Sequence, residues 1–99
     1  MQRCIILAAR RYDFRDDDGQ RREGCTLVYL TGDEDHESDR RGLFPLTIGA
    51  PLGVWHDLRE LPGHYLVDFK QRPGKGGRPQ LQAVGVQFVE AAEFVQVEV

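Results

Sequence analysis

The sequence lacks any apolar run close to the roughly 20 residues that a membrane-spanning helix requires. It also has few cysteines, since Cys4 and Cys25 are its only two and lie far apart. Two lone thiols do not make a disulfide framework and favour a reducing compartment, so we predict a cytoplasmic protein. Repeats, linkers and low-complexity tracts are absent as well, and 99 residues are enough for one core but too few for two. We therefore expect a single domain spanning residues 1–99.

Acidic residues are missing from one long segment, between Phe69 and Val89. The same segment carries four cations, which are Lys70, Arg72, Lys75 and Arg78. The chain as a whole has 13 Lys and Arg against 16 Asp and Glu, a net charge of −3 at pH 7. This balance argues against a protein that coats duplex DNA through bulk positive charge. A cationic segment on an acidic body instead indicates a local site for a polyanion, most simply nucleic acid.

The segment that carries these cations has the pattern of a β-hairpin. Strands are expected over residues 64–70 and 81–89, and the glycines and prolines between them are too many for a helix. Further strands are expected over residues 4–9, with a possible bent continuation through Tyr12 and Phe14, over 25–31, over 43–48 and over 94–99. An Asp-Gly turn is predicted at 16–20, and Pro45 favours an edge or bulge position for its strand.

Two other segments do not have a strand pattern. Residues 32–41 contain no large apolar side chain and are expected to form an exposed loop. Residues 51–61 are the one plausible helix, because Leu52, Trp55 and Leu58 could form an apolar stripe that ends at Pro62-Gly63. Five or six short strands with at most one short helix predict a small all-β barrel or sandwich.

The segment Leu-Pro-Gly-His-Tyr-Leu-Val-Asp-Phe-Lys (61–70) is followed by a glycine-rich basic turn and then by Gly-Arg-Pro-Gln-Leu (77–81). The apolar strand after it ends in Gln-Phe-Val (87–89). Together these motifs resemble the C-terminal half of the filamentous-phage single-stranded DNA-binding proteins typified by the gene V protein. The similarity covers residues 15–31 and 61–89, and the segment between them fits only in the order of its elements.

This resemblance implies a five-stranded OB-like barrel with a protruding basic hairpin and at most one short helix. It implies a homodimer that coats single-stranded DNA cooperatively, without sequence choice, during replication of a phage or mobile element, in the host cytoplasm if phage-encoded. The nucleic-acid-binding positions that carry over from the family are Arg15, Arg21, Arg22, Leu27, Tyr29, Lys70, Arg72, Lys75 and Arg78. Two departures weaken the match: the hairpin tip has no aromatic residue, and Gly85 stands where relatives can carry a contacting Arg.

Several of these residues also have a purely structural interpretation. Arg15, Arg21 and Arg22 could form a solvated turn paired with the neighbouring acidic residues. Core packing is the ordinary role for Tyr12, Phe14 and Tyr29, but both faces of residues 27–30 are apolar, so one could be a stacking surface. We take Tyr29 as the candidate for an exposed base platform. Core or interface positions are expected for Trp55, Phe69 and Phe88.

A homodimer is also expected from the apolar faces of the hairpin, which a lone barrel could hardly cover. These faces are formed by Val67, Phe69, Val84, Val86 and Phe88.

The alternative function is a small β-barrel that binds another protein through the acidic 32–41 loop or an exposed strand edge. Catalysis finds little support, because His36, His56 and His64 match no metal-binding spacing with the two cysteines. No nucleophile elbow or phosphate-binding loop is present either. We therefore expect a protein that is not an enzyme and needs no metal or cofactor.

Overall fold

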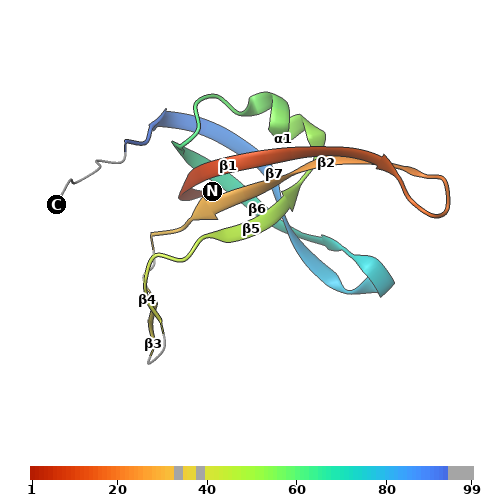
Figure 1. Ribbon diagram of the computed structural model, residues 1–99, viewed down its shortest axis with the longest axis horizontal. Coiled ribbons are helices and arrows are strands. Elements are labelled where there is room, and N and C mark those ends of the chain that lie inside the picture. Colours follow the sequence, from red (N-terminus) through yellow and green to blue (C-terminus); the bar gives the residue numbers. More distant parts are fainter. Residues whose placement is uncertain (33–34, 38–39, 94–99) are drawn as a thin grey trace.

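The computed structural model describes residues 1–32, 35–37 and 40–93, and in this part of the chain five strands close a barrel (Figure 1). Their order around the barrel is β1-β2-β5-β7-β6. The strands are β1 (Gln2–Arg15), β2 (Arg21–Leu30), β5 (Leu46–Ala50), β6 (Gly63–Pro73) and β7 (Pro79–Ala91). Neighbours are antiparallel except β5 and β7, which meet in parallel at Gly49 and Gln82. The predicted small all-β, OB-like barrel is confirmed.

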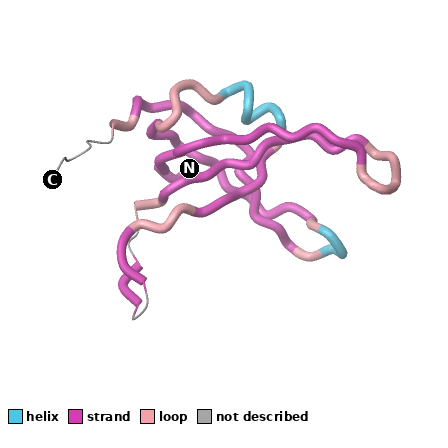
Figure 2. The backbone as a smooth tube through the Cα atoms, viewed as in Figure 1, coloured by secondary structure: helices cyan, strands magenta, loops and turns pink. Residues whose placement is uncertain are grey.

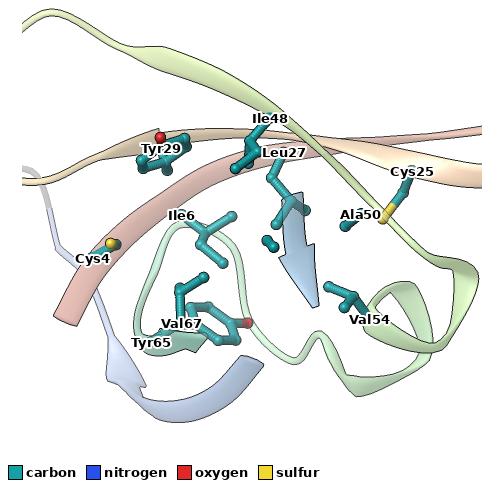
Figure 3. Close-up of a cluster of buried hydrophobic side chains, with 11 residues drawn as sticks. Cys4, Ile6, Cys25, Leu27, Tyr29, Ile48, Ala50, Val54, Tyr65 and Val67 are labelled. Carbon is teal, nitrogen blue, oxygen red and sulfur yellow. The ribbon is translucent and has the colours of Figure 1, made fainter. Parts of the chain in front are cut away.

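The core lies inside the barrel, where alternate residues of each strand meet (Figure 3). On β2, Cys25, Leu27 and Tyr29 face inward, at 0%, 1% and 8% exposure. Ile6 of the neighbouring strand β1, the cross-strand partner of Tyr29, and Val67 of β6 join them. Because side chains in a strand alternate between faces, this register sends Val28 to the outside of the barrel.

One end of the barrel is closed by the short helix α1 (Leu52–Asp57), whose Val54 is buried in the core. The predicted helix over 51–61 is too long, because the chain turns extended at Leu58. The hydroxyl of the fully buried Tyr65 explains this: it accepts a hydrogen bond from the Arg59 N–H (2.9 Å) and donates one to the Glu60 carbonyl (2.8 Å). These bonds fix the segment after α1 as a loop across the barrel end.

Three other expectations concern element boundaries. The strand predicted over 43–48 begins only at Leu46, after Pro45, which has no N–H for a sheet ladder. The predicted 32–41 loop is wrong in part, since β3 (Asp35–Glu37) and β4 (Arg40–Gly42) pair as a small separate hairpin. Ladder bonds use main-chain groups, so this hairpin needs no apolar side chain. The strand expected over 94–99 lies outside the described residues.

Two hairpins project from the same side of the barrel (Figures 1 and 2). In the first, residues 12–15 of β1 pair with residues 21–24 of β2, whereas β5 pairs with β2 only from Cys25 onward. In the second, residues 71–73 of β6 pair with residues 79–81 of β7, beyond the contact of β7 with β5 at Gln82. The short 3-10 turn η1 (Lys75–Gly77) forms its tip. We call residues 12–24 the first arm and residues 70–82 the second arm.

Candidate nucleic-acid interface

A cleft of about 760 Å³ lies between the two arms. It is open to solvent, so a polymer could pass through it. The first arm contributes Tyr12, Phe14, Asp16, Asp17, Asp18 and Arg22, and the second arm contributes Pro73, Gly74, Gln80 and Gln82.

The wall that the first arm supplies is aromatic. Tyr12 and Phe14 lie on one face of β1, with ring centroids 6.0 Å apart and planes tilted by 47°. Their exposures are 36% and 53%, so the expectation that both pack in the core is wrong. The reason is the register shift in β1 between Ile6 and Ala8, after which Ala9 packs against the core and Arg11 lies opposite the buried Cys25. Because side chains alternate along a strand, Tyr12 and Phe14 then lie on the outer face. Arg10 shares their face, is exposed, and makes no ion pair with another described residue.

A glycine fixes the tyrosine of this wall. Gly24 is the cross-strand partner of Tyr12. A Cβ at Gly24 would lie 2.7 Å from the Tyr12 hydroxyl oxygen and 2.8 Å from the carbonyl oxygen of Ala50. The tyrosine side chain therefore occupies the space that any larger residue at position 24 would need.

The wall that the second arm supplies carries two amides, and cations lie on the same face of the arm. Gln80 pairs across the arm with Arg72, and Gln82 pairs with Lys70. Since cross-strand partners share a face of a sheet, these four side chains belong to one face. Arg72 is exposed and has no ion-pair partner among the described residues. The Lys70 ammonium is 4.0 Å from Asp68, at the limit of an ion pair.

The tip of the second arm adds Arg78, which is exposed and also without an ion-pair partner in the part of the chain that is described. Gly76 and Gly77 have φ of 70° and 73°, a left-handed backbone that glycine adopts readily. Lys75 belongs to this turn by its backbone. The tip therefore presents positive charge on a tight turn that contains no acidic residue.

The arginines of the first arm are paired instead. Arg21 binds Asp13 at 2.8 Å and Glu23 at 3.4 Å, and Arg22 binds Asp16 at 3.0 Å. The hydrogen bond from Arg21 holds the pKa of Asp13 below its usual range. Arg21 and Arg22 thus make the ion pairs of a solvated turn, and their role in nucleic-acid binding stays a prediction. These ion pairs are exposed, and exposed pairs contribute little to stability, so a phosphate could compete for either arginine.

The turn of the first arm is organised by one carboxylate. Asp16 Oδ1 accepts hydrogen bonds from the N–H groups of Asp18 (3.0 Å) and Gln20 (2.9 Å). The Gln20 bond, followed by the Arg22 side chain, lowers the pKa of Asp16. Arg15 donates to the Gly19 carbonyl at 3.1 Å, so its guanidinium also supports the turn.

Two of the predicted binding residues are wrong as exposed contacts. Leu27 and Tyr29 belong to the core, where the Tyr29 ring lies 5.6 Å from the ring of Phe69. A base could reach them only if the barrel opened. Sequence reasoning did not find the aromatic pair on β1 or the amides of Gln80 and Gln82. A signal for the aromatic pair was present: residues 21–24, Arg-Arg-Glu-Gly, lie opposite residues 12–15 and include no large apolar side chain that could build a core there.

Comparison with known proteins found no matching family model, no matching curated protein and no matching solved structure. The resemblance to gene V-like proteins therefore stays a prediction. The candidate interface is therefore assigned from the side chains that form it: aromatic rings on the first arm, and amides and cations on the second. No helix in the described part of the chain is long and apolar enough to cross a membrane.

Proposed function

We propose that this protein binds single-stranded DNA without sequence choice and coats it cooperatively during replication of a phage or mobile element. The observation that carries the proposal is the exposed ring pair, Tyr12 and Phe14, on one wall of a cleft whose other wall belongs to a cationic arm. Nonspecific single-strand binding needs these two elements: flat groups on which unstacked bases lie, and cations that follow the phosphates.

The arrangement favours single strands over duplex. Stacking on Tyr12 and Phe14 requires a base with a free face, which paired and stacked DNA does not offer. The net charge of −3 gives the protein little general attraction to DNA, so binding depends on the local cations.

The charges also orient the strand in the cleft. Asp17 and Asp18, which line the cleft at the end of the first arm, repel phosphates, while Arg72 and Arg78, exposed on the second arm beside the cleft lining, attract them. The strand then lies with its bases toward the first arm and its backbone toward the second.

Homodimerisation remains part of the proposal, but the surface expected to form the dimer differs from the one predicted from the sequence. The faces expected to be uncovered are largely covered, since Val67 is buried and Phe69, Val86 and Phe88 pack against the core. The remaining apolar surface of β7 includes Leu81, which is 48% exposed on the face of the second arm opposite Gln80 and Gln82. A dimer through this face would leave the cleft free, and light scattering should then give about twice the 11.3 kDa chain mass.

The test is fluorescence anisotropy with a labelled oligonucleotide, single-stranded and duplex, over a range of salt. On single-stranded DNA each phosphate that a cation neutralises contributes about −0.7 to the slope of log K against log salt. If three cations of the protein each neutralise one phosphate, the slope should therefore be about −2. Phe14→Ala should weaken single-strand binding by roughly 1–3 kcal/mol if a base stacks there. Phe44→Ala is the matched control, because Phe44 is 40% exposed and does not line the cleft. Equal binding of duplex and single strand, or equal effects of the two variants, would contradict the proposal.

A further inference from the structure

One cation of the barrel lies beside the aromatic wall but does not line the cleft. Arg10, Tyr12 and Phe14 alternate along β1, so they share one face and follow one another at about 7 Å by strand geometry. Arg10 is exposed and makes no ion pair or side-chain hydrogen bond with another described residue. A free guanidinium therefore stands at the foot of the first arm, next to Tyr12 on the barrel side.

The acidic residues of these strand segments lie on the other face. Residues 8–15 of β1 and 21–28 of β2 contain two carboxylates, Asp13 and Glu23. The two are cross-strand partners, one position along from the pair that Tyr12 makes with Gly24. Because side chains alternate along a strand, both carboxylates point away from the face of Arg10. A polyanion that follows this face of the strands meets no carboxylate there.

Small and neutral residues connect Arg10 with the cleft. Arg10 pairs with Thr26 of β2, Thr26 with Gly49 of β5, and Gly49 with Gln82 of β7, which lines the cleft. Since neighbouring partners in a sheet share a face, these four residues form one row across the feet of both arms. A Cβ at Gly49 would meet no atom within 4 Å outside its chain neighbours, so the space above the row is open there.

We propose that Arg10 is a phosphate contact, and that the bound strand leaves the cleft across this row on the outer face of β1, β2 and β5. The inference rests on the proposed single-strand binding and extends its site from the cleft onto the barrel. Arginine suits the position because its guanidinium keeps its charge and offers several N–H donors in a planar fork. Arg10 then joins Arg72 and Arg78 as the third cation of the expected salt slope of about −2.

The next residue in the chain is a matched control. Arg11 is also exposed, but it pairs with Cys25 and so belongs to the opposite face of β1. It makes no ion pair with another described residue and does not line the cleft. Arg10→Gln and Arg11→Gln therefore remove the same charge from adjacent positions, and they differ in the face from which it is removed.

The experiment is a set of anisotropy titrations of oligo(dT) over about 50–200 mM salt. Loss of one phosphate contact removes about 0.7 from the slope of log K against log salt and, at 50 mM salt, weakens binding about 8-fold by counterion release. Arg10→Gln should therefore change the slope from about −2 to about −1.4, and Arg11→Gln should leave it unchanged. Arg10→Lys should keep the slope of the unaltered protein, because lysine keeps the charge.

A second readout leaves the protein intact. The side-chain N–H signals of Arg10 in an NMR spectrum should shift as oligo(dT) is added, because a phosphate oxygen accepts hydrogen bonds from the guanidinium. The corresponding signals of Arg11 should stay in place. This measurement remains informative even if a variant fails to fold, because it uses the unaltered chain.

The outcomes separate the inference from the function beneath it. If the protein binds single strands and responds to Phe14→Ala, but Arg10→Gln keeps its salt slope, the contact is wrong and the proposed function stands. Equal flattening by Arg10→Gln and Arg11→Gln, or flattening by Arg10→Lys, would also overturn the contact, as would unshifted Arg10 signals in the presence of bound DNA. If the unaltered protein binds no single-stranded DNA, both proposals fall.

Discussion

The two arms have the same construction, a strand pair that continues past the barrel, but they differ in the state of their charges. Arg21 and Arg22 of the first arm are held by acidic neighbours at 2.8 and 3.0 Å. Arg72 and Arg78 of the second arm have no ion-pair partner among the described residues. Cations that look equivalent in the sequence are therefore not equally available to a phosphate.

The difference extends to the turns. The first arm closes through the carboxylate of Asp16, which accepts two backbone N–H groups. The second arm closes through backbone bonds, from the Gly74 N–H to the Arg78 carbonyl (2.7 Å) and from the Gly77 N–H to the Gly74 carbonyl (3.2 Å). The first arm thus uses charge to hold its own shape, whereas Arg72 and Arg78 of the second make no ion pair with another described residue. This suggests that the first arm supplies the stacking surface and the second supplies the phosphate contacts.

Removing the free cations should have the largest effect. If Arg72 and Arg78 each neutralise one phosphate, Arg72→Gln/Arg78→Gln should flatten the salt slope by about 1.4 and, at 50 mM salt, weaken binding roughly 60-fold by counterion release. Anisotropy titrations over 50–200 mM salt measure both quantities.

The matched variant removes a paired cation together with its partner. Arg21→Gln/Asp13→Asn takes out the 2.8 Å ion pair without changing the net charge. Its salt slope should stay within experimental error of that of the unaltered protein. Equal flattening in the two double variants would mean that the arms share the phosphate contacts, and the comparison between them would fail.

Two glycines, one at the base of the first arm and one in the barrel part of β7, test how closely the backbone is packed at each place. Gly24→Ala would place a Cβ 2.8 Å from the Ala50 carbonyl oxygen and 2.7 Å from the Tyr12 hydroxyl, so it should cost about 1–3 kcal/mol of stability. Gly85→Ala in β7 would meet only the Asp68 Cβ at 3.9 Å, an ordinary contact. It should stabilise by about 0.4–1 kcal/mol through the unfolded chain. Urea unfolding midpoints at constant slope measure both. A neutral Gly24→Ala would show that Tyr12 is not fixed against the barrel.

The barrel was predictable because its strands have strong local signals. The Asp-Gly turn and the glycine-rich turn each predict an antiparallel pair, and both pairs form. The direction of β2 side chains was not predictable, because Leu27 and Tyr29 on one face are as apolar as Val28 and Leu30 on the other. Period-2 alternation cannot choose between two apolar faces, and only the closure of the barrel decides.

The candidate site was harder to predict, because it depends on how far each strand runs. Tyr12 and Phe14 share the alternation of the buried Cys4 and Ile6, and their exposure follows from the register shift between Ile6 and Ala8, which no residue pattern announces. Ion pairing also depends on register. Arg21 lies opposite Arg15 and reaches Asp13 diagonally, a contact that no fixed sequence spacing predicts. The unpaired cations of the second arm were easier to find, because their segment contains no acid at all.

Acid should distinguish the two turns, and this is the smallest effect we expect. The bond from the Gln20 N–H, and then the Arg22 side chain, lower the pKa of Asp16. The pKa of an aspartate in the unfolded chain is about 3.9. A carboxyl with a lower pKa in the folded state contributes its full stabilisation at pH values above 3.9. The stabilisation is lost as the pH falls through 3.9 toward the folded pKa, because the unfolded chain then binds the proton first. The first turn should therefore loosen below about pH 4 while the second does not.

Amide hydrogen exchange, expressed as protection factors between pH 6 and pH 3, can follow the two turns in one sample. Protection of the Asp18 and Gln20 amides should fall with acid, because both donate to Asp16, while the Gly74 amide, which donates to a backbone carbonyl, should keep its protection. Asp16→Asn keeps an acceptor oxygen without the titrating charge, so it should remove the acid dependence of the first turn and leave the second unchanged. If both turns lose protection together, global unfolding is responsible and the arms do not differ in this way. If only the first responds, and only with Asp16 in place, its shape depends on an ionised side chain and that of the second arm does not.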